Sequence, residues 1–126
     1  MVDLTRLTTY ALGQSKMVSG TVTIFVPGST AGVTTIEHEP GLVKDLKRTW
    51  QDLIPVQGPY AHNRDGEDNG HAHLRASLVG PSLTVPIVKG KLALGTWQQI
   101  VLLDFDTHPR HRTVLFQFVG ESSPPE

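Results

Sequence analysis

Four polar side chains that can do chemistry alternate with four apolar ones along residues 71–78. In a β-strand, successive side chains point to opposite faces. One face would then carry two imidazoles, a guanidinium and a hydroxyl, from His71, His73, Arg75 and Ser77. The other face would be small and apolar, as a row that faces a core should be. We therefore predict a strand that presents a functional site.

The histidines of this strand are candidate metal ligands. An H-x-H pair on a strand lets both rings reach one ion, and His62, in the polar run just upstream, would supply a third nitrogen. Three protein ligands leave room for water or substrate, as in catalytic zinc sites. An H-x-H pair is also found among solvated or locally hydrogen-bonded histidines. We keep His62, His71 and His73 as candidate ligands of a divalent metal, either zinc or magnesium.

A second set of side chains could bind phosphate. The Arg75 guanidinium offers paired donors that match phosphate oxygens, although a salt bridge to a nearby carboxylate is an equal alternative. Ser29, Thr30 and Ser77 could donate hydroxyl groups, although short polar residues beside glycine and proline more often form turns.

A third set of side chains could act as general acids or bases. The unperturbed pKa of histidine lies close to neutral pH, which makes His73 a candidate acid or base. Glu37 stands next to a predicted helix and could be a general base or a metal ligand. Asp65 and Asn69 would position these groups, as a carboxylate positions a ligating imidazole. For Asp65, the alternative is an acidic loop residue that is simply solvated.

Composition sets the class of protein. The chain has 126 residues, a length that suits one domain with a real core. A formal net charge of −1 gives no general attraction to nucleic acid or to anionic membranes. There is no cysteine for disulfides or thiolate chemistry. No apolar run approaches the ~20 residues that cross a bilayer. We expect a cytoplasmic protein with no nucleic-acid or membrane partner.

The elements that must position these residues are mostly strands. Twelve glycines and nine prolines indicate many turns. Strands are predicted at 21–26, 33–36, 83–87, 91–94, 99–105 and 113–119, besides the histidine strand. Pro86 suggests that its strand lies at an edge or carries a bulge.

One helix is clearly predicted. Pro40 suits a first helical turn, and apolar residues follow at spacings near four up to Pro55. A further helix is possible at the N-terminus, with Asp3 as its cap. The predicted fold is therefore α+β: a compact, β-rich, sandwich-like single domain over residues 1–126, with one main helix at about 40–54.

Four stretches of the chain resemble the YjbQ-like family, also called UPF0047. They are residues 25–32 (FVPGSTAG), 37–42 (EHEPGL), 69–86 (NGHAHLRASLVGPSLTVP) and 90–98 (GKLALGTWQ). The similarity covers nearly the whole chain, and the motifs occur in the right order.

The resemblance implies a compact β-rich α+β fold and a homotrimer, which would also cover exposed strand edges. It further implies the activity of a secondary thiamine-phosphate synthase, which joins hydroxymethylpyrimidine diphosphate to thiazole phosphate and releases pyrophosphate. Among the histidines, His73 fits the family motif best. Gln98 ends the fourth of these stretches, and the resemblance implies that it is a polar contact at the site. The alternative is a non-enzymatic trimer that binds a metal or a small anionic metabolite.

This chain departs from the family pattern in two places. Many relatives begin with an extra strand before the first helix, for which Met1 leaves almost no room. Many also carry a His-Thr pair and an Asn-Glu pair where this chain has Gly28-Ser29 and Ile36-Glu37. A site in this chain must therefore work without that histidine and that asparagine.

Overall fold

The computed structural model describes residues 1–123 and contains two antiparallel sheets and three α-helices. The elements are β1 (Val2–Asp3), α1 (Thr5–Ser15), β2 (Met17–Phe25), β3 (Ala31–Ile36), α2 (Pro40–Leu53), the 3₁₀ turn η1 (Ala61–Asn63), α3 (Gly70–Val79), β4 (Ser82–Val88), β5 (Lys91–Leu92), β6 (Gln99–Asp104) and β7 (Leu115–Ser122). This arrangement confirms the predicted α+β class.

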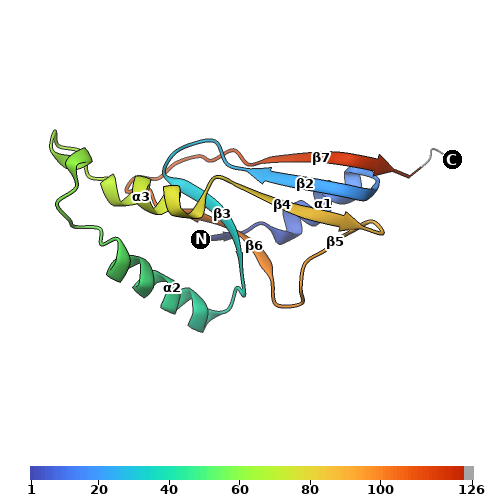
Figure 1. Ribbon diagram of the computed structural model, residues 1–126, viewed down its shortest axis with the longest axis horizontal. Helices are drawn as coiled ribbons and strands as arrows, with labels where there is room; N and C mark the ends of the chain where they lie inside the picture. The colour runs from blue at the N-terminus through green and yellow to red at the C-terminus, as the bar shows by residue number, and fades with distance from the viewer. Residues whose placement is uncertain (124–126) are drawn as a thin grey trace.

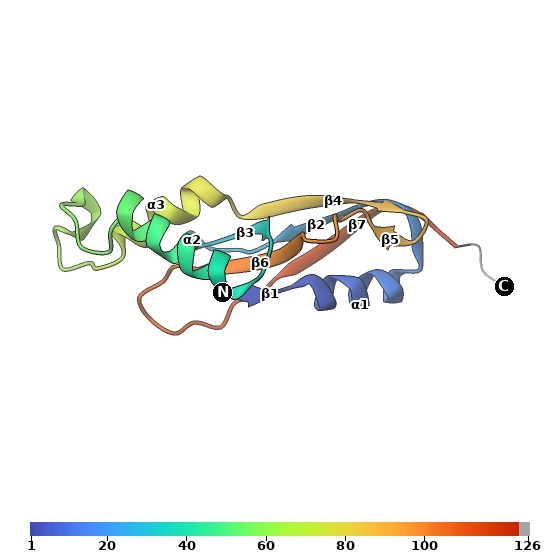
Figure 2. The ribbon, with the colours of Figure 1, turned by 90° about the horizontal axis from the view of Figure 1, so that it is seen from below.

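The strands form one sheet in the order β1-β6-β3 and another in the order β5-β4-β2-β7. Figure 1 shows that α2 and α3 lie together at one end of the molecule, whereas the four-stranded sheet extends to the other. Figure 2 shows α1 running below that sheet, on one side of it. Both sheets contain strands that the sequence predicts. The predicted strand at 91–94 is shorter than expected, because it pairs only over Lys91–Leu92.

The core lies between the two sheets and α1. On β4, the side chains of Val85 and Ile87 are buried and those of the intervening residues are exposed, as a period of two requires. Val22 and Ile24 of β2 and Ile100 of β6 complete the centre of the same cluster. Helix α1 adds Leu4 and Leu12 to it.

Two predictions about the edges of the sheets have clear outcomes. Pro86 predicted an edge strand or a bulge, and this prediction is wrong, because β4 lies between β5 and β2 and pairs with β2 in an unbroken register. The carbonyl of Pro86 accepts a 2.9 Å hydrogen bond from the Ala93 N–H just past β5. The nitrogen of Pro86, which carries no N–H, therefore points to the β5 side of β4. It lies beyond the two residues over which β5 pairs with β4, so the missing N–H breaks no ladder hydrogen bond between them. At the N-terminus, the sheet is completed by the short strand β1, which pairs Val2 with Leu102 and Asp3 with Val101.

Helix α2 confirms the main helical prediction. Pro40 occupies its first turn, and the carboxylate of Glu39 accepts hydrogen bonds from the backbone N–H groups of Gly41 and Leu42. None of its residues is buried, however. Its apolar stripe faces a pocket rather than the core.

The histidine segment is a helix, and the predicted strand is wrong. The segment that forms α3 contains alanine, leucine and arginine, which favour helices, and no β-branched residue before Val79. Ala72 and Ala76, one turn apart, are buried, and α3 packs on β3. Gly32 makes this close packing possible, because a Cβ there would lie 2.6 Å from a side-chain carbon of Val79.

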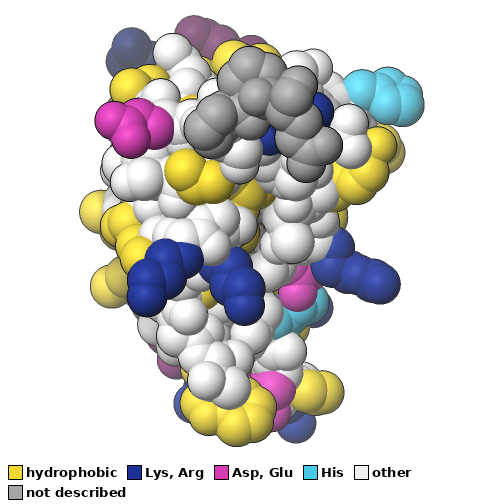
Figure 3. Space-filling view, turned by 90° about the vertical axis from the view of Figure 1, so that its right-hand side faces the viewer, with side chains coloured by type: hydrophobic (Ala, Val, Ile, Leu, Met, Phe, Trp, Pro, Cys, Tyr) yellow, Lys and Arg dark blue, Asp and Glu magenta, His cyan; other side chains and the backbone are white. Residues whose placement is uncertain are grey.

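Basic, acidic and hydrophobic side chains are interspersed on the face of the molecule shown in Figure 3, which is consistent with the small net charge. Within residues 1–123, no helix is long and apolar enough to cross a membrane.

Candidate functional site

The helical geometry of α3 separates residues that a strand would have placed together. Residues two apart on a helix point in different directions, whereas residues four apart share a face. His71 therefore shares a face with Arg75 and not with His73. Most of the candidate residues accordingly fall into three separate groups, and the others lie apart from them.

The first group is a pair of histidines near the start of α3. The rings of His62 and His73 meet edge to face, with centroids 4.6 Å apart. The Nε2 atom of His62 lies 3.0 Å from Oδ1 of Asn69. The side chain of Asn69 thus contacts the imidazole of the exposed His62 on η1, and the positioning role of Asn69 at a reacting site stays a prediction.

The second group borders a small hollow further along α3. Ser29 and Ser77, which are distant in sequence, both line this hollow of about 170 Å³. The Ser77 hydroxyl donates a 2.8 Å hydrogen bond to the carbonyl of His73 on its own helix. Thr30 is buried instead, and its hydroxyl is held by Asp106 and Arg112.

Three further candidates lie away from these groups. Glu37 and Asp65 are exposed, and neither is among the residues that line the hollow or the pocket described next. Gln98 is also exposed, where its side chain accepts a hydrogen bond from the Gly95 N–H and donates one to the Thr35 hydroxyl. These contacts stabilise the turn before β6.

The third group lies in a pocket that is larger than this hollow. His71 and Arg75 face a cavity of about 490 Å³ between α2, α3 and the end of β6. Its walls combine apolar and charged side chains, which suits a small organic anion. The residues that line it include Leu46, Lys47, Trp50, His71, Arg75, Phe105 and Asp106.

Two buried nitrogens in this pocket have no hydrogen-bond partner within residues 1–123: Nδ1 of His71 and Nε1 of Trp50. His71 is only 3% exposed. A buried polar group without a partner costs about 1–3 kcal/mol of folding free energy. Both residues line the same cavity, so a single ligand that reached the two nitrogens would satisfy both.

The charge in the pocket comes mainly from Arg75. Its Nε and Nη2 donate hydrogen bonds of 3.1 and 2.8 Å to the carbonyl of Ile54, which caps α2. The guanidinium lies 5.8 Å from the centre of the Phe105 ring. Burial lowers the pKa of Arg75. Burial, followed by the nearby charge of Arg75, lowers the pKa of His71, which favours a neutral imidazole.

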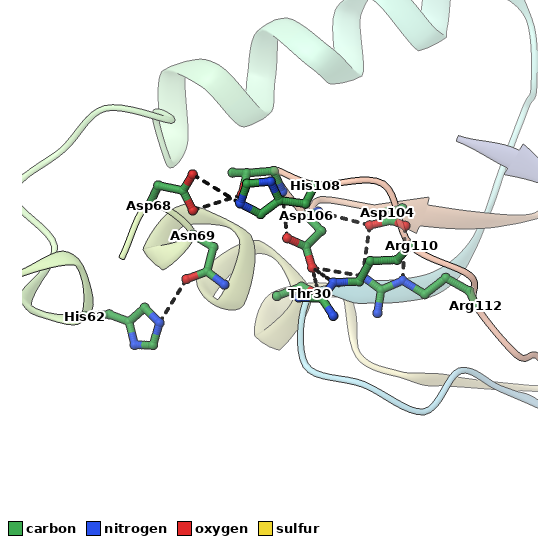
Figure 4. A network of polar contacts seen from close by, with 10 residues as sticks. Thr30, His62, Asp68, Asn69, Asp104, Asp106, His108, Arg110 and Arg112 are labelled. Atoms are coloured by element: carbon green, nitrogen blue, oxygen red, sulfur yellow. Dashed lines mark hydrogen bonds and ion pairs between the residues drawn. The ribbon is translucent and has the colours of Figure 1, made fainter. Parts of the chain in front are cut away.

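Asp106 carries a negative charge beside the pocket, but basic residues neutralise it (Figure 4). Its carboxylate accepts hydrogen bonds from Thr30 and Arg110, and Arg112 lies 3.7 Å away. Burial alone would raise the pKa of Asp106, but the hydrogen bonds from Thr30, Arg110 and the Thr107 N–H lower it to about 2.

Arg112 is held in turn by a second carboxylate. Its Nε and Nη2 bind both carboxylate oxygens of Asp104, at 3.1 and 3.0 Å. These ion pairs fix the loop after β6 against β3. They leave Arg75 and the exposed Lys47 as the cations available to a ligand in the pocket.

Several residues of this pocket were missed at the sequence level. The sequence places Trp50 only within the predicted helix at 40–54, and Phe105 only within the predicted strand at 99–105. Asp106, which follows β6, received no role. The signal that could have found this site was helical spacing, because His71 and Arg75 are four residues apart.

The described residues do not bring together the three predicted metal ligands. Within residues 1–123, no group of three or more histidine, cysteine, aspartate or glutamate side chains is close enough to hold a metal ion. His62 and His73 are adjacent, whereas His71 faces the pocket. Metal binding stays a prediction, and no chemical step below depends on it.

Comparison with known proteins gives a consistent result. A family model described as UPF0047 protein YjbQ-like matches residues 1–121. A UPF0047 protein of Methanocaldococcus jannaschii is 38% identical over 122 residues, which cover 96% of this chain and 86% of that protein. The UPF0047 protein YugU of Bacillus subtilis is 36% identical, with 95% of this chain and 89% of YugU covered.

Solved structures agree with these matches. A hypothetical protein from Aeropyrum pernix K1 superposes with a TM-score of 0.89 at 38% identity, over 95% of this chain and 88% of that one. A protein of unknown function from Sulfolobus solfataricus P2 gives 0.90 at 35% identity, over 95% and 86%. None of these names states a reaction, so thiamine-phosphate synthesis stays a prediction.

Proposed function

Because this chain belongs to the UPF0047 YjbQ-like family, we propose that it binds a small phosphorylated metabolite in the pocket of His71 and Arg75. One observation carries the proposal: His71, buried to 97%, has a ring nitrogen without a hydrogen-bond partner within residues 1–123, and it lines a cavity that Arg75 also lines. A neutral imidazole supplies one donor and one acceptor, and an arginine supplies donors that match phosphate oxygens.

The size and walls of the pocket support a ligand with an apolar body. A volume of about 490 Å³ is within the range of small-molecule sites. Leu46, Trp50 and Phe105 would cover the body of the ligand. Arg75 and Lys47 would face the phosphate. The Nη1 atom of Arg75 is not used by Ile54 and would donate to a phosphate oxygen.

The reaction that we propose is the one that the family resemblance implies. The thiazole nitrogen would form a C–N bond to the methylene carbon of the pyrimidine as the C–O bond to pyrophosphate breaks. The electron pair of that bond leaves with pyrophosphate. The attacking nitrogen carries no proton, so the step needs no general base. It needs stabilisation of charge on the leaving group, which Arg75 and Lys47 would provide.

The test uses the purified protein with hydroxymethylpyrimidine diphosphate and thiazole phosphate. Formation of thiamine phosphate and release of pyrophosphate are measured together. Two matched variants locate the site on α3. We expect His71→Phe to lower the rate at least about tenfold, the effect of losing one hydrogen bond to a charged group. His73→Phe, two residues away, should leave most of the activity.

The result also separates catalysis from simple binding. If neither product appears above background while titration calorimetry detects binding of either precursor, the alternative of a non-enzymatic metabolite-binding protein is favoured. If His73→Phe abolishes activity and His71→Phe does not, the site belongs to the histidine pair and our assignment is wrong.

A further inference from the structure

Helix α2 forms one wall of the pocket and is not part of the buried core. None of its residues is buried, although Leu46 and Trp50 line the cavity. Its ends are tied by hydrogen bonds: at the start, the His38 N–H donates to Gln99 at 2.8 Å, and at the end Arg75 binds the Ile54 carbonyl. In Figure 1, α2 stands apart from both sheets. The hydrogen bonds thus fix the two ends of α2, whereas its middle turns contact the rest of the protein through side chains that line the pocket.

Trp50 is the residue of α2 with an unmet hydrogen bond. Its ring contacts Phe105 edge to face, with centroids 5.2 Å apart, so its position is defined. The indole Nε1 is a donor only. It is buried and has no acceptor within residues 1–123. Because buried donors are nearly always paired, an acceptor is expected in this cavity.

The acceptor is best supplied by a part of the ligand other than its phosphate. Arg75 on α3 and Lys47 on α2 already provide cations for an anionic group. Trp50 and Phe105 form the aromatic part of the wall. A ring nitrogen or carbonyl oxygen on a flat ligand body would place a neutral acceptor beside the indole and the ring against apolar side chains.

We propose that α2 closes on the ligand through the Trp50 N–H, which donates a hydrogen bond to a neutral acceptor on the flat body of a phosphorylated ligand. This inference rests on the proposed function, because it takes the phosphate to lie at Arg75. It makes Trp50 a specificity-determining residue that distinguishes heterocyclic phosphates from purely hydrocarbon ones.

Two probes of the same size isolate this hydrogen bond. Pyridin-3-ylmethyl phosphate carries a ring nitrogen acceptor, and benzyl phosphate does not. The affinity of each is measured by titration calorimetry for the wild-type protein, for Trp50→Phe and for Trp97→Phe. Trp97 is 73% exposed and serves as the matched control. We expect the wild type and Trp97→Phe to prefer the pyridyl probe roughly three- to tenfold. Trp50→Phe should lose this preference.

Hydrogen–deuterium exchange tests the movement of α2 in the same samples. The pyridyl probe should slow exchange of the amides of Pro40–Leu53 in the wild type, and less so in Trp50→Phe. If both probes bind without a preference, or if exchange in α2 does not change, the inference fails while the proposed function stands. If neither probe binds, both fail.

A second copy of the chain is the other possible cover for α2. In that case, exchange in α2 would slow with rising protein concentration in the absence of probe, and that result would also overturn the inference.

Discussion

Thr30 donates a 3.0 Å hydrogen bond to Asp106, and this contact joins the start of β3 to the loop that follows β6. The two residues are 76 positions apart in the chain. The side chain of Asp106 is fully shielded from solvent. Its contacts hold the loop that forms one side of the pocket of His71.

The first prediction concerns acid stability. The pKa of Asp106 is about 2 in the fold, against 3.8 for an ordinary aspartate. The unfolded chain therefore binds more protons between these values, and stability falls as the pH falls. The contribution, about 2 kcal/mol, is complete above pH ~4 and lost as the pH drops through about 2.

Urea unfolding between pH 7 and pH 2 measures this effect. Asp106→Asn should be less stable than the wild type at pH 7, and the difference should shrink toward pH 2. Asp65→Asn, at an exposed loop position, is the control and should change little. Equal acid sensitivity of Asp106→Asn and the wild type would contradict the role given to this carboxylate.

The second prediction separates stability from binding at His71. Replacement by phenylalanine removes a buried nitrogen that has no partner in the fold, so the free energy of unfolding should stay the same or rise by up to about 1–3 kcal/mol. Binding of pyridin-3-ylmethyl phosphate should weaken at least about tenfold. Thermal unfolding and calorimetry measure the two effects. A loss of stability without a loss of affinity would indicate that His71 is a packing residue.

The third prediction tests the pairing of β2 with β7. Gly20 and Gly120 face each other across these strands with φ values of +151° and +149°. A Cβ on Gly20 would lie 2.1 Å from the carbonyl oxygen of Val119. We expect Gly20→Ala to destabilise the protein by about 2 kcal/mol or more.

Gly13 is the matched control for this substitution. It lies in α1, and a Cβ there would meet no atom within 4 Å. Gly13→Ala should raise the free energy of unfolding by about 0.5–1 kcal/mol, because alanine favours helices. Chemical denaturation of both variants gives the comparison, and a neutral Gly20→Ala would show that the strands can separate at this point.

The fourth prediction concerns metal binding. If zinc binds at the histidines, the geometry of α3 requires that His62 and His73 hold it and that His71 does not. Zinc retained after gel filtration should fall in His62→Ala and His73→Ala and stay at the wild-type level in His71→Phe. Elemental analysis provides the measurement. A wild-type protein that retains no zinc after loading would contradict metal binding at this pair.

The fifth prediction is the homotrimer. Large apolar side chains are exposed, among them Leu74 and Leu78, one turn apart on α3, at 46% and 64%. Exposed apolar surface of this kind marks interaction sites. Light scattering at micromolar concentration should give three times the 13.8 kDa mass of the chain. A monomeric mass would refute the trimer.

The amino-acid sequence alone determined the α+β class, helix α2 and most strands. These elements follow from local rules: alternation in β4, the proline at the start of α2, and glycine or proline at the turns. The family could also be recognised from the sequence, because its motifs are contiguous. Arg75 and His71 were both named as candidates and placed on one face, although of a strand, and their roles stay predictions.

Only the tertiary structure decided which of these residues meet. Alternation in the segment 71–78 suits a strand, but its alanines pack one helical turn apart on β3, and Gly32 lets the helix approach. Side chains repeat every 3.6 residues on a helix and every two on a strand. In the helix, His71 therefore points away from His73 and lies on the same face as Arg75. Trp50 and Asp106 joined them through contacts between segments far apart in the chain, which no local pattern encodes.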